Sequence, residues 1–148
     1  MKVGFLEQNF SYFLTYLGLL PFFALLLMIL TYPVNSNLYT YSLSMLKSYG
    51  LLIATFLAGS HWGINLNSDV NLHLPFLSNL ILIFIWLSYT FLSSFYFIIS
   101  LLFVFNILLL IDKKLLLESI ISYAYFWLRA RVTCFVNLVL LTLTVTLW

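Results

Sequence analysis

The length of its apolar stretches is the feature that most constrains how this chain folds. Residues 74–111 contain no charged side chain, and a helix needs only ~20 apolar residues to cross the hydrocarbon of a bilayer. Similar stretches fill most of the remaining sequence, so that 64% of the residues are hydrophobic and 7% are charged. A soluble domain needs more polar residues to cover its surface. The composition therefore predicts an all-α, polytopic membrane helix bundle.

Breaks between these stretches predict five membrane helices within a single transmembrane domain. Polar residues at 32–37 and 67–73 have the composition of loops. Serine, threonine and tyrosine residues at 88–94 predict a tight hairpin that divides the long apolar stretch. The charged residues 112–114 predict a sharp helix end. The predicted spans are residues 11–31, 41–66, 74–89, 93–111 and 128–148.

Three local features add detail to these spans. Residues 115–127 mix Leu and Ile with polar and tyrosine side chains, which predicts a short helix at the membrane interface. Pro21 lies inside the first span beside Gly18 and predicts a kink there, because proline removes a helical hydrogen bond. Cys134 is the only cysteine, so an internal disulfide is excluded, and we expect a buried, inert thiol.

Positive charges predict the orientation of the bundle. With five spans, Lys47 alone falls on the side opposite the N-terminus, and cytoplasmic loops carry the excess of Lys and Arg. The N-terminus is therefore expected in the cytoplasm and the C-terminus outside. The start of the chain does not resemble an Arg-rich transit peptide, which favours a bacterial inner membrane over a mitochondrial inner membrane. The charges on the N-terminal side are Lys2, Lys113, Lys114, Arg129 and Arg131.

Most of the unusual chemistry lies at residues 58–63 of the second span. Gly59 and Gly63 are four residues apart and share one helix face, which predicts helix packing through close backbone approach. His61 is the only histidine within a predicted span, and it points roughly away from the two glycines. An imidazole in lipid needs a hydrogen-bond partner, so we expect His61 to bond a polar group of another helix.

Helical rise places several other polar side chains at the depth of His61 in the cytoplasmic half of the bundle. Buried amides and imidazoles require partners, so a shared network is predicted. Such a network either fastens the helices together, which is the favoured interpretation, or lines a ligand pocket. The candidate ligand-binding residues are His61, Trp62, Asn79, Asn106, Arg129, Arg131 and Asn137.

The sequence resembles a known family at several of these positions. The segment Ala58-Gly59-Ser60-His61-Trp62-Gly63 is similar to a Gly-Gly-x-His-Trp-Gly pattern, with Ala58 in place of the first glycine. Residues 16–21, 111–115 and 127–133 extend the resemblance over most of the chain. The family comprises small bacterial and mitochondrial-type membrane proteins catalogued as a domain of unknown function. The resemblance implies a five-helix membrane protein and leaves its activity open.

Three functions are compatible with these features. The small size, the glycines and the aromatic content favour a non-enzymatic structural, accessory or assembly subunit that contacts the lipid bilayer and other membrane proteins or a second copy. The alternative is a quinone- or lipid-binding protein with its pocket near His61. A small-solute transporter acting as an oligomer is less favoured, because no Asp or Glu lies inside a predicted span and no inverted repeat is evident.

Other chemistries are disfavoured. No catalytic residue is predicted, because Ser60 beside His61 lacks an orienting carboxylate and points elsewhere on the helix. No metal site and no cofactor are predicted. Haem is disfavoured because the second histidine, His73, lies in a loop. The few charges give no indication of nucleic-acid binding.

Overall fold

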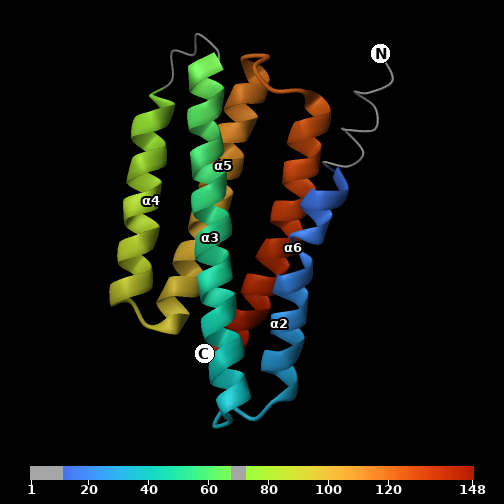
Figure 1. Ribbon diagram of the computed structural model, residues 1–148, viewed down its shortest axis with the longest axis vertical. Coiled ribbons are helices and arrows are strands. Elements are labelled where there is room, and N and C mark those ends of the chain that lie inside the picture. The colour runs from blue at the N-terminus through green and yellow to red at the C-terminus, as the bar shows by residue number, and fades with distance from the viewer. Residues whose placement is uncertain (1–11, 68–72) are drawn as a thin grey trace.

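The protein is an all-α bundle of five antiparallel helices (Figure 1). The computed structural model describes residues 12–67 and 73–148. Within these ranges, five helical segments are long and apolar enough to cross a membrane. Residues 12–17 are helical and precede the first labelled helix. The labelled helices are α2 (Leu20–Thr31), α3 (Asn37–Asn67), α4 (Leu74–Phe91), α5 (Ser94–Leu117) and α6 (Tyr123–Leu147).

The predicted hairpin within residues 74–111 is confirmed. Helix α4 ends at Phe91 and α5 begins at Ser94, so the turn needs only two residues. Lys47 of α3 donates a hydrogen bond to the Ser94 hydroxyl at 3.2 Å, and its ammonium lies over the ring of Tyr89. The turn is therefore held against α3 by a cationic side chain. Ser11, Lys2 and most of the predicted loop at 67–73 lie outside the described residues.

The predicted end of a helix at residue 111 and the predicted interfacial helix at 115–127 are wrong. Helix α5 continues to Leu117, and α6 begins at Tyr123. Charges did not end α5, because Lys113 and Lys114 lie on its exposed face while Leu115 is fully buried. The helix ends instead where Ser119 adopts a φ of 60°.

The end of α5 is a hydrogen-bonded reversal of the chain. The amide of Ile120 donates to the carbonyl of Leu115 at 3.0 Å, and the amide of Ser119 donates to that of Leu116 at 2.9 Å. This pair of bonds is the Schellman pattern, which satisfies the last carbonyls of a helix. On the other side of the turn, the Ser122 side chain accepts from the amide of Tyr125 and caps α6.

The predicted kink beside Pro21 is confirmed as a break in the first span. The helical conformation is interrupted at Gly18 and Leu19, and Pro21 occupies the first turn of α2, where its missing N–H costs nothing. The Tyr49 hydroxyl of α3 donates to the Gly18 carbonyl at 2.8 Å. The break is therefore tied to the neighbouring helix.

The prediction that Gly59 and Gly63 pack against another helix is wrong within this chain. Both lie exposed, and a Cβ added to either would meet no described atom within 4 Å. Close packing occurs instead at Gly50, where an added Cβ would lie 2.8 Å from Leu101 of α5. The predicted burial of Cys134 is also wrong, because its side chain is exposed on α6.

We predict that Gly50→Leu destabilises the bundle by about 1–3 kcal/mol, because Leu101 is fully buried and cannot move aside without disturbing the core. Gly59→Leu is the matched control on the same helix, since its side chain enters open space. The midpoint of thermal unfolding in detergent, followed by circular dichroism, measures both. Equal midpoints for the two variants would contradict the assigned packing.

Candidate functional site

Helix α5 packs against both α3 and α6, whereas α3 and α6 make no comparable contact with each other. The space between α3 and α6 is covered by α2, which packs against α3 and more lightly against α6. Polar side chains of α3 and α6 can therefore meet only through α5 or across the space between α3 and α6.

Three ionisable side chains meet at this position. The Asp112 carboxylate of α5 lies 2.9 Å from Nε2 of His61 on α3, through Oδ1, and 3.1 Å from Nε of Arg129 on α6, through Oδ2. All three residues are buried, with 1%, 0% and 6% of their surfaces exposed for His61, Asp112 and Arg129. Because an ionised carboxylate only accepts hydrogen bonds, Nε2 carries the imidazole hydrogen and donates it to Asp112.

Burial makes the pairing obligatory. Removing charged groups from water costs several kcal/mol per ion, and a close partner must compensate for that cost. Asp112 supplies this compensation for Arg129 and at the same time satisfies one nitrogen of His61. The carboxylate therefore joins three helices through two oxygens. We refer to His61, Asp112 and Arg129 as the buried triad.

The buried triad leaves polar atoms without partners. Nδ1 of His61 is buried and makes no hydrogen bond to a described residue. Of the three guanidinium nitrogens of Arg129, only Nε has a hydrogen-bond partner within residues 12–67 and 73–148. The two terminal nitrogens therefore keep their donors for another group.

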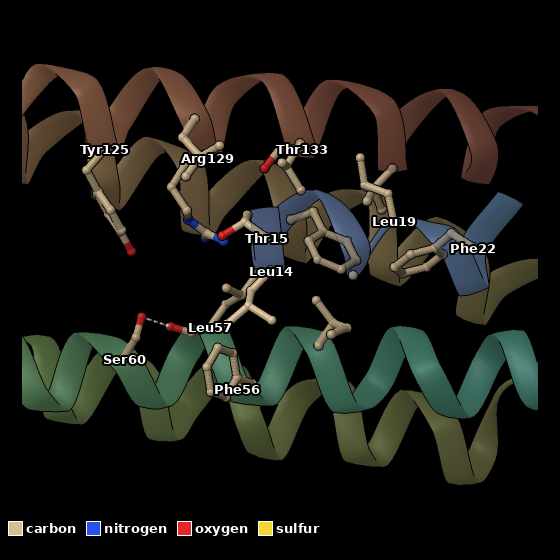
Figure 2. A pocket seen from close by; sticks show the side chains of 16 residues that line it. Leu14, Thr15, Leu19, Phe22, Phe56, Leu57, Ser60, Tyr125, Arg129 and Thr133 are labelled. Carbon is tan, nitrogen blue, oxygen red and sulfur yellow. Dashed lines mark hydrogen bonds between the residues drawn. The ribbon is translucent and has the colours of Figure 1, made fainter. Parts of the chain in front are cut away.

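A cavity of about 490 Å³ lies next to Arg129, between α3 and α6 (Figure 2). Its walls are mostly apolar and include Leu19, Phe22, Phe105 and Val136. Its polar end contains Arg129, whose guanidinium points into the space between the helices, with Tyr125 and Ser60 beyond it (Figure 2). The volume lies within the range of sites for small molecules, ~300–1,000 Å³.

The hydroxyls at the polar end face each other across the cavity. Figure 2 shows Tyr125 of α6 and Ser60 of α3 pointing toward one another. Ser60 donates to the Leu57 carbonyl at 2.7 Å, which leaves its oxygen able to accept. Thr133 of α6 is buried and lines the cavity next to the apolar part. Hydrogen-bonding groups thus lie at one end and around one side of an otherwise apolar space.

The cavity opens sideways between the first span and α3. Leu14 and Phe56 line it and are nevertheless exposed on the outside of the bundle, with 49% and 72% of their surfaces accessible. Leu14, Thr15 and Gly18 lie before or at the helix break, and Phe22 lies after it. The break therefore shapes the wall of the cavity that faces the outside of the bundle.

A known family matches almost the whole chain. The family described as "Protein of unknown function (DUF3429)" matches residues 8–145. The chain belongs to this family. No curated protein and no solved structure matches it. Membership of DUF3429 thus agrees with the resemblance seen in the sequence and assigns no activity.

The predicted site residues of this DUF3429 protein come together as two separate pairs. His61 and Arg129 meet through Asp112, which agrees with the expectation that His61 bonds a polar group of another helix. Asn106 and Asn137 instead bond each other, with nitrogen–oxygen distances of 3.2 and 3.4 Å, on an exposed surface. The prediction that Asn106 and Asn137 share a hydrogen-bond network with His61 is therefore wrong. Trp62, Asn79 and Arg131 are exposed and lie outside the triad.

Asp112 is not among the predicted site residues, because the charged segment 112–114 predicts a helix end. The prediction that no acidic residue lies inside a span is wrong at this position, since Asp112 is buried within α5. A signal was present, since Leu108, Ile111 and Leu115 continue the spacing of three and four residues through the charged segment, which is typical of one continuous buried helix face. Asp112 lies on that face, four residues after Leu108.

Within the described part of this DUF3429 chain, no group of three or more His, Cys, Asp or Glu side chains is placed to hold a metal ion. The buried triad contains one histidine and one carboxylate, and its third member is a cation. Its chemistry is therefore that of a charged hydrogen-bond network beside an apolar cavity.

We predict that Asp112→Asn lowers the free energy of unfolding by about 3–5 kcal/mol, because it leaves Arg129 buried without a counter-charge. Lys113→Gln is the control, since it alters the charge of the adjacent, exposed residue. Thermal or denaturant unfolding in detergent compares the two. If Asp112→Asn proved as stable as the wild type, the triad would not be important for the fold.

Proposed function

We propose that this protein is a multi-pass membrane protein that binds one amphiphile, a lipid or a quinone, in the cavity between α3 and α6. The observation that carries this proposal is Arg129, which bonds Asp112 through Nε only and lines an apolar cavity with its two terminal nitrogens still available as donors. A ligand that supplies an acceptor at Arg129 and an apolar tail for the walls satisfies both parts of the site.

The tail and the head of such a ligand would contact different residues. The tail would lie against Leu19, Phe22 and Phe105, which are buried at the apolar end. The head would lie at Arg129, whose planar guanidinium can bond two oxygens of one group. Tyr125 and Ser60 offer further hydroxyls on the same side (Figure 2).

The lateral opening supports a ligand that arrives from the bilayer. Exposed Leu14 and Phe56 flank the cavity, and both are apolar. An amphiphile moving within a leaflet would pass between them without leaving a hydrocarbon environment. A water-soluble metabolite would instead have to cross an apolar opening to reach Arg129.

Photolabelling tests this proposal. Protein in nanodiscs would be irradiated with either phosphatidylglycerol or ubiquinone that carries a diazirine in its tail, and the adducts mapped by mass spectrometry. We expect adducts on the cavity walls, and Val136→Phe should reduce them roughly tenfold, a change worth about 1.4 kcal/mol of affinity, because Val136 is a buried wall residue.

Leu138→Phe is the matched control for Val136→Phe, because Leu138 lies on the same helix with 55% of its surface exposed. It should leave the adducts on the cavity walls unchanged. Adducts confined to outward-facing residues, with neither variant altering them, would refute the binding proposal.

A non-enzymatic accessory or assembly subunit is the second candidate. The support comes from Gly59 and Gly63, which lie exposed on α3 and leave room for the backbone of a helix from another chain.

We also propose an inner membrane of bacterial type, with the N-terminus in the cytoplasm. The triad end of the bundle carries Lys113, Lys114 and Arg131, which are exposed, whereas Lys47 belongs to the other half. Excess positive charge on the cytoplasmic side supports this orientation.

Cysteine labelling measures the orientation. In a Cys134→Ala background, Ser36→Cys should react with an impermeant maleimide added to intact spheroplasts, because residue 36 lies in the turn between α2 and α3. Glu118→Cys, in the turn after α5, should react only after the membrane is opened. The reverse pattern would invert the topology.

A further inference from the structure

The charges of the buried triad sum to zero in the state that the geometry describes. Asp112 contributes one negative charge and Arg129 one positive charge. We assign His61 as neutral with its hydrogen on Nε2, because no described residue offers an acceptor for a second hydrogen at Nδ1. The cavity next to Arg129 therefore contains strong hydrogen-bond donors without a net charge to attract an anion. Any charge that a ligand brings into this site must be balanced from elsewhere.

The donors that face the cavity are suited to an oxyanion. The two terminal nitrogens of Arg129 form a planar fork that matches two oxygens of a carboxylate or phosphate. The hydroxyl-bearing Thr133, which is buried, lines the same cavity. A group with two or three acceptor oxygens uses more of these donors than a single carbonyl oxygen does.

The missing charge can be supplied at His61. Its Nδ1 is buried and bonds no described residue, so the nitrogen presents a bare lone pair. A proton added there converts the imidazole to an imidazolium, while Nε2 keeps its hydrogen and continues to donate to Asp112 at 2.9 Å. Histidine is the side chain whose charge changes most readily near neutral pH.

We infer that the cavity takes an amphiphile with an anionic head and that its binding is accompanied by the uptake of one proton at Nδ1 of His61. The inference rests on the proposed binding function. The charge balance is complete: one new N–H bond forms at Nδ1, the triad gains one positive charge, and the oxyanion at Arg129 contributes one negative charge. The occupied site is again neutral.

The groups around His61 leave it as the proton acceptor of the site. From α5 it faces Asp112, which is already shared by two donors. The titratable groups of α6 at the cavity are Arg129 and Tyr125. The remaining described titratable groups of the helices packed on α3 at this end are Tyr12 and Tyr16 before α2, His73 at the start of α4, and Lys113, Lys114 and Glu118 on or after α5. Tyr12 is half-buried and the others are exposed.

The ligand chemistry is an oxyanion on a long alkyl chain. A free fatty acid supplies it as a carboxylate, and a phospholipid supplies it as a phosphodiester. Both place the charge at one end of an apolar tail, as the cavity does with Arg129 and its apolar walls (Figure 2).

Calorimetry on the full chain in detergent tests the inference. Hexadecanesulfonate, whose charge does not change near neutral pH, is compared with neutral hexadecanol between pH 6 and 8.5, in two buffers of different ionisation enthalpy. Sulfonate binding should take up one proton, so its Kd should rise about tenfold per pH unit where His61 is unprotonated in the free protein. Hexadecanol should bind with no proton uptake and a flat pH profile.

Two variants separate this coupling from a structural effect. His61→Gln should weaken sulfonate binding at low pH and abolish both its pH dependence and its proton uptake, with hexadecanol binding retained. Asp112→Asn should strengthen sulfonate binding at high pH. Arg129 then has no counter-charge, so the sulfonate binds without a proton. A purely structural role of these residues would change the binding of both probes alike.

The wild-type measurement decides the inference even if the variants fold poorly. Hexadecanol binding together with sulfonate binding that is flat with pH and takes up no proton would overturn the inference and leave the proposed binding function intact. Failure of both probes to bind would overturn the binding function and the inference with it. Competition by palmitate or by phosphatidylglycerol then distinguishes the free acid from the phospholipid as the source of the anion.

Discussion

One carboxylate in the interior of an apolar bundle determines how three of its helices are arranged. Asp112 accepts from His61 with one oxygen and from Arg129 with the other, so α3, α5 and α6 are fixed in rotation and depth at the same point. Van der Waals packing alone fixes neither property strongly when every helix is apolar on all sides. The pairing therefore gives this membrane bundle a register that its leucines and phenylalanines could not specify.

The same pairing keeps α3 and α6 apart. Two side chains and a carboxylate extend across the interval between them, and the residues further along the two helices line a cavity rather than a contact. A buried ion pair is weak evidence for stability in itself, because desolvation offsets much of its attraction. Its role here is more readily understood as positioning. It holds the two terminal nitrogens of Arg129 toward a cavity of defined size.

The sequence predicted the number of helices and the α4–α5 turn because these depend on length and composition. It predicted the rotation of the helices poorly, and the reason is physical. In lipid, apolar residues cover the outside as well as the inside of a bundle, so hydropathy does not show which face of α3 carries Gly59 and which carries Ala58. Likewise, depth placed Asn106 near His61, but depth does not fix direction around the axis of α5. Asp112 required a different inference, namely that a buried helix face can continue through a charged segment.

The break at Gly18 and Leu19 has a consequence for how the site can vary. The cavity is bordered by large side chains, including Phe22, Phe56 and Phe105, and by the small residue Gly18. The backbone leaves the helical path at Gly18 and is anchored there by the Tyr49 hydroxyl. Wall residues can therefore be exchanged among apolar types, which would change the shape of the alkyl chain that fits. The cavity itself persists as long as the helix break at Gly18 and its hydrogen bond from Tyr49 remain.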